Sequence, residues 1–543
     1  MSNGIFNMPC PKNEPIQDYR PGGPEKAQLK AALQELSSKE LEIPVVINGE
    51  EVKTGNIGKC VMPHNHSHLL GHYHQAGTKE VEAAITGALK VRKDWAGLPW
   101  EERAGIFMKA AEILAHEKRY LLNAATMLNM SKTPIQAEID SACELIDFWR
   151  FNIQYMEQIY RQQPQSTPLS WNRVEHRGLE GFVFAITPFN FAAIAGNLPT
   201  APAMMGNVVV WKPASSAVYP AYHILKILEQ AGLPPGVINF VPGSGGTVGD
   251  PVLAHPSFAG IHFTGSTPVF QSMWKTIGNN IQNYHTYPRI VGETGGKDFV
   301  FAHASADIDA LSVALVRGAF EYQGQKCSAA SRAYIPRSIW PQVKEKIVEM
   351  TKELKVGDVS DFTNFMGAVI DQKAFNSIKS YIDYAKNSNE ATILVGGTYD
   401  DSVGYFIDPT IVETTNPKFK LMEEEIFGPV LTIYVYADTD LDEALELCNT
   451  TSPYGLTGSI FARDRRDIVS LSKALSEASG NFYVNDKPTG AVVGQQPFGG
   501  ARASGTNDKA GSLINLQRWV SQRTIKENLL PPRDYRYPHL EEK

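Results

Sequence analysis

Short runs of apolar residues alternate with helix-like stretches from Gly181 onward. The runs are Phe182 to Ile186, Val208 to Trp211, Val237 to Val241, Gly260 to Phe263, Arg289 to Gly292 and Asp298 to Ala302. Such alternation predicts a parallel β-sheet covered by helices, and ligands of such sheets bind beyond the carboxyl ends of the strands. We therefore expect an α/β fold whose chemistry lies in the loops after these runs.

A second set of apolar runs follows residue 327 and predicts a second α/β lobe. Its strands are expected near Ala333 to Ile335, Leu431 to Tyr436, Gly458 to Phe461 and Asn481 to Val484. At 543 residues the chain exceeds what one hydrophobic core usually supports, so two or more domains are expected. The predicted architecture is therefore two parallel-sheet lobes that meet near residue 327.

The pattern differs outside these lobes. Residues 1–44 are rich in proline and charge and are expected to form a loosely held arm, followed by a strand and a hairpin turn from Val45 to Glu50. Apolar residues at helical spacing from Lys79 to Trp149 predict a helical layer in which nothing indicates chemistry. Residues 151–178 fit neither a core strand nor a core helix, and Trp519 to Ile525 is β-prone. We expect a projecting ribbon that pairs with a second subunit, with a surface flap as the alternative.

Composition limits the classes of function. A net charge of -7 gives no electrostatic footprint for nucleic acid or an anionic membrane, so small-molecule partners are expected. The stretch from Gly181 to Trp211 carries no charged side chain, but its prolines and asparagines argue against a membrane span. Five widely spaced cysteines without a CxxC pair argue against disulfides and zinc and for a reducing compartment. The cytoplasm is expected, or the mitochondrial matrix if a transit peptide was removed.

One cysteine stands apart from the others. Cys143 and Cys448 lie in helix-like contexts, where packing in the core is the better interpretation. Cys327 lies in a loop of small residues beside Lys326, and a nearby cation lowers the pKa of a thiol. The pattern makes Cys327 a candidate nucleophile, although a mid-chain cysteine is more often a small buried hydrophobe.

Two glycine-containing segments are candidates for binding a phosphate. Gly243 to Gly249 fails the G-x-G-x-x-G fingerprint because its third glycine falls one place late. Phe263-Thr264-Gly265-Ser266 fits better, since it ends a strand and opens a helix whose free N–H groups favour a phosphate. An N-cap role for Ser266 is the alternative.

Six motifs taken together resemble the aldehyde dehydrogenase superfamily. They are Pro188-Phe189-Asn190-Phe191, Trp211-Lys212-Pro213, Phe263-Thr264-Gly265-Ser266, Glu293-Thr294-Gly295-Gly296-Lys297, Gly324-Gln325-Lys326-Cys327 and Glu425-Ile426-Phe427-Gly428-Pro429. The resemblance extends from about Val45 to Ile525. Within the superfamily, the segment from Asn485 to Lys509 is similar to the signature of the 1-pyrroline-5-carboxylate dehydrogenases.

The resemblance implies a division of the chain and a catalytic apparatus. Residues 45–150 and 179–293 would form an NAD-binding domain and 294–503 a catalytic domain. Residues 151–178 and 512–543 would form the oligomerisation flap and C-terminal strand of a homodimer or higher homo-oligomer. Cys327 would attack the aldehyde to give a thiohemiacetal and then a thioester, which splits one hard oxidation into two easier steps. Asn190 and the backbone N–H of Cys327 would hold the oxyanion, and Glu293 would activate water.

The resemblance also implies ligand contacts, with NAD as cofactor and no metal. Lys212 would bind the adenine ribose, Gly265 and Ser266 the pyrophosphate, and Glu425 the nicotinamide ribose, with Phe427 packed near the nicotinamide. Many members carry Glu where this chain has Ser215, a difference that weakens the exclusion of NADP. The remaining implied contacts are to substrate: Ser328, Gly490 and Ala491 to a carboxylate, and Phe191 and Phe498 on either side of an aliphatic chain.

The implied reaction is the NAD-dependent oxidation of L-glutamate γ-semialdehyde to L-glutamate in proline degradation. The alternative is another short carboxylated aldehyde such as succinate semialdehyde. Transfer of the acyl group to coenzyme A has no use for the base Glu293. A non-catalytic binding protein would not need the thiol, and a cysteine hydrolase leaves the cofactor motifs unexplained. The 44 residues before Val45 are too few for a flavin domain, so proline oxidation is expected in a separate protein.

Overall fold

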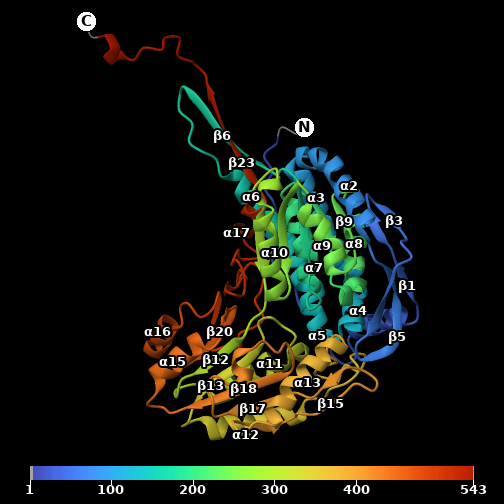
Figure 1. Ribbon diagram of the computed structural model, residues 1–543, viewed down its shortest axis with the longest axis vertical. Helices are drawn as coiled ribbons and strands as arrows, with labels where there is room; N and C mark the ends of the chain where they lie inside the picture. The colour runs from blue at the N-terminus through green and yellow to red at the C-terminus, as the bar shows by residue number, and fades with distance from the viewer. Residues whose placement is uncertain (1–3, 542–543) are drawn as a thin grey trace.

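The structure, a computed structural model, describes residues 4–541 as two α/β lobes with a ribbon that projects from the end of one of them (Figure 1). The first lobe is built on a seven-stranded sheet in the order β11-β10-β7-β8-β9-β2-β3. Its strands are β11 (Arg289–Glu293), β10 (Phe258–Thr264), β7 (Phe182–Ile186), β8 (Val208–Lys212), β9 (Ile238–Phe240), β2 (Val45–Ile47) and β3 (Glu50–Val52). The first five strands run parallel, as the apolar runs predict.

Helices pack against this sheet and form the predicted helical layer beside it (Figure 1). They are α2 (Thr78–Gly97), α3 (Trp100–Ile113), α4 (Arg119–Met130), α5 (Pro134–Ala137), α6 (Leu145–Arg161), α7 (Ala192–Met204), α8 (Val218–Ala231), α9 (Gly245–Ala254) and α10 (Thr267–Asn279). The charge-free stretch from Gly181 folds as β7, α7 and most of β8, and these elements are largely buried in this lobe. Within residues 4–541, none of the helices combines the length and apolar character that crossing a membrane requires.

The second lobe has its own seven-stranded sheet in the order β14-β17-β18-β13-β12-β20-β21. Its strands are β14 (Ala391–Val395), β17 (Thr410–Thr414), β18 (Val430–Tyr436), β13 (Ala330–Pro336), β12 (Asp298–Ala302), β20 (Thr457–Phe461) and β21 (Asn481–Val484). Its helices are α11 (Ile308–Phe320), α12 (Trp340–Glu353), α13 (Gln372–Lys386), α14 (Lys420–Glu423), α15 (Leu441–Thr450) and α16 (Arg465–Ala474). Only the edge strand β14 is antiparallel to its neighbour in this sheet. The prediction of two parallel-sheet lobes is confirmed.

Smaller elements connect and flank the lobes. They are α1 (Pro24–Ser37), the sheet of β1 (Leu41–Ile43), β5 (Asn65–His74) and β4 (Ile57–Met62), the pairs β15 (Tyr399–Asp400) with β16 (Phe406–Ile407) and β19 (Tyr454–Gly455) with β22 (Ala501–Arg502), and α17 (Leu513–Gln517). The hairpin expected after Val45 is formed by β2 and β3, and both Asn48 and Gly49 adopt positive φ in its turn.

Two expectations about the flanking segments are wrong. Residues 151–161 do not belong to a flap but continue α6, where Ile153, Met156 and Ile159 are buried at a spacing of three. The ribbon itself consists of β6 (Ser170–Arg177) paired antiparallel with β23 (Ser521–Asn528). The arm before Val45 is not loosely held, because it contains α1 and β1 and is hydrogen-bonded to the first lobe.

Candidate active site

Four parallel strands of the first lobe bring their carboxyl ends to one edge of the sheet. Lys212 at the end of β8 pairs with Ile186 at the end of β7, and Glu293 at the end of β11 pairs with Thr264 at the end of β10. The loop after β7 carries Asn190, so this residue begins from the same edge. The expected cofactor and catalytic residues of the first lobe therefore gather where parallel sheets bind ligands.

The candidate nucleophile reaches this edge from the second lobe. Cys327 lies in the loop before β13, and its side chain is 8% exposed. The thiol donates to Glu293, with Sγ 3.8 Å from Oε1. Residues from the two lobes thus form one pair of reacting groups, a thiol and a carboxyl.

The backbone before Cys327 is held in an unusual conformation. Tyr322 and Gln323 have φ of 52° and 56°, in the left-handed region that side chains other than glycine rarely adopt. The buried Gln323 amide fixes this turn, since it donates to the carbonyls of Ser131 (2.9 Å) and Ala368 (2.7 Å). Gly324 follows at φ 65°, where a Cβ would lie 2.2 Å from a backbone oxygen. The loop that carries the thiol is therefore rigidly set.

Burial controls the protonation of the pair. It raises the pKa of Glu293 to about 7. Burial and the Glu293 carboxylate together raise the pKa of Cys327 well above that of a free thiol. The expectation that Lys326 lowers this pKa is wrong, because Lys326 is paired with Glu321 at 3.2 Å. The resting site is a neutral thiol beside a carboxyl group that can take its proton near neutral pH.

An amide donor lies close to the thiol loop. Asn190 is 4% exposed, and its Nδ2 donates to the backbone oxygen of Gln325 at 3.1 Å. A side-chain amide has two hydrogens on this nitrogen, so one stays available for a ligand. This geometry allows Asn190 to donate to an oxygen bound at the carbon that Cys327 attacks.

One cavity brings together all the residues that the resemblance implies for the substrate. It measures about 110 Å³, and its walls include Phe191, Cys327, Ser328, Gly490, Ala491 and Phe498. The Ser328 hydroxyl is hydrogen-bonded to that of Thr489 at 2.8 Å. Gly490 has φ 98°, a conformation that favours glycine and leaves the backbone open to a ligand.

Two carboxyl groups that the sequence did not indicate line the same cavity. Asp140 and Glu144 lie on the π-helical turn Glu138–Glu144, inside the layer in which no chemistry was expected, and both line the cavity. Burial and the neighbouring Asp140 raise the pKa of Glu144 to about 8. The available signal was a lone carboxylate within the otherwise apolar stretch Ala142-Cys143-Glu144-Leu145-Ile146, which was interpreted as core packing.

The expected cofactor residues present several groups with few protein partners. Lys212 is 8% exposed, donates to the carbonyl of Pro213 at 3.2 Å, and has a pKa lowered to about 8 by burial. Ser266 is the N-cap residue of α10, yet its side chain makes no capping hydrogen bond to that helix. The hydroxyl is therefore available to a ligand at a helix N-terminus, where an anion is favoured.

The other residues expected to bind the cofactor each have defined local contacts. Gly265 donates to the backbone oxygen of Glu293 at 3.2 Å, which fixes the start of α10 against β11. Glu425 accepts from the N–H of Gly296 at 2.8 Å, and burial raises its pKa to about 7. Phe427 has φ 56°, and its ring packs edge-on to Phe189, with centroids 5.7 Å apart. Ser215 begins a 3-10 turn just after β8.

The segment that failed the dinucleotide fingerprint has a structural role. Ser244 is the N-cap of α9, and its hydroxyl accepts from the N–H of Thr247 at 3.3 Å. Cys143 and Cys448 pack in the interior, as expected. Both are buried, and burial raises the pKa of Cys448 to about 12.

Comparison with known proteins agrees with the geometry. The family model described as "Aldehyde dehydrogenase family" matches residues 52–525. The mitochondrial Delta-1-pyrroline-5-carboxylate dehydrogenase of Dictyostelium discoideum is 51% identical over 98% of this chain and 96% of its own. That of Homo sapiens is 49% identical over 97% and 94%.

Solved structures are similar along the whole chain. A crystal structure of the Delta-pyrroline-5-carboxylate dehydrogenase from Mycobacterium tuberculosis bound with NAD matches with a TM-score of 0.96 and 50% identity, covering 100% of both chains. A 1-pyrroline-5-carboxylate dehydrogenase from Thermus with bound NAD matches with a TM-score of 0.90 and 32% identity, covering 96% of this chain and 100% of that one.

Proposed function

The chain belongs to the aldehyde dehydrogenase family, and on that premise we propose that it oxidises L-glutamate γ-semialdehyde to L-glutamate with NAD, a step of proline degradation. The observation that carries the proposal is the cavity that contains the Cys327 thiol at one place and the Gly490-Ala491 backbone at another. The first suits an aldehyde and the second a carboxylate. The names of the Dictyostelium and human relatives support the same substrate.

The first half of the reaction joins the substrate to the enzyme. Glu293 accepts the Cys327 proton, and Sγ then forms a bond to the aldehyde carbon. The aldehyde oxygen becomes an oxyanion, which receives hydrogen bonds from Nδ2 of Asn190 and from the backbone N–H of Cys327. The result is a thiohemiacetal on Cys327.

The second half releases the acid. When bound, NAD supplies a hydride acceptor, so the thiohemiacetal carbon loses a hydride and becomes a thioester. Glu293, having released its first proton, takes a proton from water, and the hydroxide adds to the thioester carbon. The bond from carbon to Sγ breaks, Glu293 gives its proton to the Cys327 thiolate, and the product acid releases its own proton to solvent and leaves as a carboxylate.

The residues at the sheet edge fit the cofactor. Lys212 is a buried cation whose protein partner is a carbonyl, so it can donate to a ribose hydroxyl. The free Ser266 hydroxyl at the start of α10 suits a pyrophosphate. Glu425 provides acceptor oxygens for the hydroxyls of the second ribose. Ser215 offers no carboxylate to repel a 2′-phosphate, so the preference for NAD over NADP would come from the other contacts.

The cavity distinguishes the proposed substrate from succinate semialdehyde. Ser328 and the N–H groups of Gly490 and Ala491 can hold a carboxylate, which both aldehydes have, although that of succinate semialdehyde lies one carbon closer to the aldehyde. The half-buried Glu144 lines the same cavity, and its carboxyl can pair with an α-ammonium group, which succinate semialdehyde lacks. This observation favours glutamate semialdehyde.

The test is NADH formation by the purified protein with 1-pyrroline-5-carboxylate, run beside succinate semialdehyde, with NADP in place of NAD as a cofactor control. Cys327→Ala is expected to abolish NADH formation while binding NAD as tightly as the unmodified protein does. Undiminished turnover by Cys327→Ala would rule out the mechanism, and faster turnover of succinate semialdehyde would rule out the substrate.

Location and assembly are part of the proposal. Five free cysteines suit a reducing compartment, which is the cytoplasm or the mitochondrial matrix. The matrix remains an alternative because the names of the Dictyostelium and human relatives include "mitochondrial". We also infer a homodimer or higher homo-oligomer built through the β6-β23 ribbon.

A further inference from the structure

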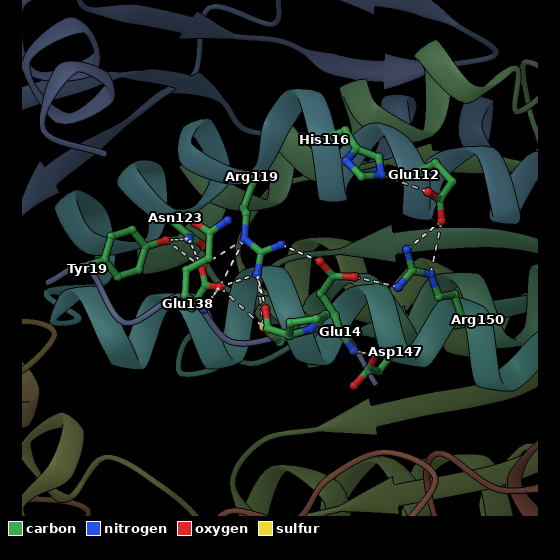
Figure 2. A network of polar contacts seen from close by, with 12 residues as sticks. Glu14, Tyr19, Glu112, His116, Arg119, Asn123, Glu138, Asp147 and Arg150 are labelled. Carbon is green, nitrogen blue, oxygen red and sulfur yellow. Dashed lines mark hydrogen bonds and ion pairs between the residues drawn. The ribbon is translucent and has the colours of Figure 1, made fainter. Parts of the chain in front are cut away.

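The first part of the arm, residues 4–23 before α1, is anchored on the first lobe by buried carboxylates. Glu138 is fully buried and accepts from the N–H of Gln17 (2.9 Å) and the hydroxyl of Tyr19 (2.6 Å). Glu14 lies between Arg119 and Arg150 and pairs with both, as Figure 2 shows. An arm held by so many charge-assisted bonds can carry a fixed contact to another part of the molecule.

That contact is made by Asn13. Its Nδ2 donates to Oδ2 of Asp147 on α6 and to the backbone oxygen of Val493, both at 2.8 Å. Its Oδ1 accepts from Nε2 of Gln495 at 2.9 Å. The Asn13 side chain thus uses both of its amide hydrogens and its oxygen. One hydrogen binds Asp147 of the first lobe, and the other two bonds go to the loop that contains Val493 and Gln495. The N–H of the next residue, Glu14, donates to the other Asp147 oxygen at 2.8 Å (Figure 2). This bond fixes the backbone beside Asn13.

The bonded loop is the one that ends in the candidate carboxylate site. Val493 and Gln495 follow Gly490 and Ala491 by two to five positions and precede Phe498. The loop is largely exposed at Gly490, Val492, Gly494 and Gln495, so few core contacts restrain it. The Val493 side chain is 6% exposed. Within the loop, the N–H of Val492 donates to the Gln496 side chain at 2.9 Å, and the N–H groups of Gln495 and Gln496 donate to the carbonyl of Val492 at 3.0 Å. These bonds make residues 492–496 one turn, and Asn13 ties that turn to α6.

We propose that Asn13 is a positioning residue that holds the Gly490-Ala491 backbone where it grips the substrate carboxylate, an inference that rests on the proposed function. Asn13 is not among the residues that line the cavity. It ties the far side of the loop to α6, a helix whose neighbouring turn carries Glu144 in the same cavity. The arm therefore sets the distance between the groups that hold the two ends of the amino acid moiety.

The experiment compares two aldehydes in Asn13→Ala. The KM for glutamate semialdehyde is expected to rise about tenfold, because a loop released from two hydrogen bonds binds the carboxylate less well. The kcat for that substrate and the kcat/KM for butanal, which has no carboxylate, should stay within about twofold, since the thiol and Glu293 are untouched. Gln495→Ala removes the loop side of the same contact from an exposed position and should raise the same KM in the same direction, even if Asn13→Ala folds poorly.

Asn7→Ala is the matched control on the same arm, because Asn7 pairs with Arg161 rather than with the loop. It should leave both aldehydes unaffected. An unchanged KM for the semialdehyde in Asn13→Ala and Gln495→Ala would overturn the inference, and so would an equal loss with butanal, which indicates a general structural role. Failure of the proposed function gives a different result: the unmodified protein would not turn over the semialdehyde at all. In that case the inference about Asn13 would fall together with the proposed function.

Discussion

The protonation of Glu293 sets the pH dependence of the reaction. Burial raises its pKa to about 7, so below that pH most of the group is protonated and cannot accept the Cys327 proton. We predict that kcat/KM rises with pH up to about 7 and falls about tenfold per unit well below it. Initial rates of NADH formation between pH 5 and 9 would check this.

Glu293→Gln is the matched variant, because it keeps the shape of the side chain and removes the base. The rate at neutral pH should fall by about 100-fold to 10,000-fold, and the acidic limb of the profile near pH 7 should disappear. Persistence of that limb in Glu293→Gln would assign it to another group.

Glu144 gives a prediction about selectivity. Its pKa of about 8 leaves it largely neutral in the empty cavity, and pairing with an ammonium group would favour the charged form. Glu144→Gln should therefore raise the KM for glutamate semialdehyde about tenfold and leave that for succinate semialdehyde nearly unchanged. Steady-state kinetics with the two substrates would decide, and equal effects on both would contradict the assignment.

At the residue scale, the sequence identified the candidate catalytic residues but not the charges and burial around them. The motifs led to Cys327 and Glu293, and the structure brings their side chains within 3.8 Å. The sequence could not show that Lys326 is neutralised by Glu321, because their pairing depends on the turn at Tyr322. It also missed Glu144, since a carboxylate beside apolar residues has the same local pattern whether it faces solvent or a cavity.

At the scale of elements, Asp140 connects two helices beneath the site. Its carboxylate accepts from the N–H groups of Ala192 and Ala193 at the start of α7, both at 2.9 Å, and pairs with the buried Lys132 at 2.6 Å. Asp140→Ala would leave an unpaired cation in the core and should lower the free energy of unfolding by about 3 to 5 kcal/mol. Denaturant unfolding would measure the change.

Asp371→Ala provides the control for this prediction. Asp371 is the half-buried N-cap of α13 and accepts from the N–H of Ala374 at 2.8 Å, without a buried cation beside it. Its replacement should lower the free energy of unfolding by about 1 kcal/mol. Similar losses in the two variants would show that Asp140 acts as a helix cap alone.

Strands were predicted correctly where a continuous apolar run was bounded by residues typical of turns. The runs at Phe182 and Asn481 match β7 and β21 from end to end, and the Asn-Gly pair after Val45 forms its hairpin. The strands β14 and β17 were not predicted. Strand β14 is half-exposed at the sheet edge, and β17 has Ile411 and Val412 as its apolar residues, so their apolar signal is weaker than that of the central strands.

At the scale of the whole molecule, the ribbon is the feature that one chain leaves incomplete. Strands β6 and β23 pair along their full lengths, from Ser521 with Arg177 to Asn528 with Ser170, and stand away from the body (Figure 1). Leu169 and Trp171 are 54% and 56% exposed on this ribbon. An open two-stranded ribbon with exposed apolar side chains is unstable alone, so a second copy is expected to cover it.

We therefore predict that the protein is at least dimeric and that the double variant Leu169→Glu/Trp171→Glu dissociates it. Charges buried between two copies would oppose association, whereas on a free surface they would be harmless. Light scattering coupled to gel filtration would report the mass. Val403→Glu, at a position 59% exposed in the second lobe, adds a charge away from the ribbon and should leave the mass unchanged. An unaltered oligomer in the double variant would show that the ribbon is a surface flap and that assembly uses another face.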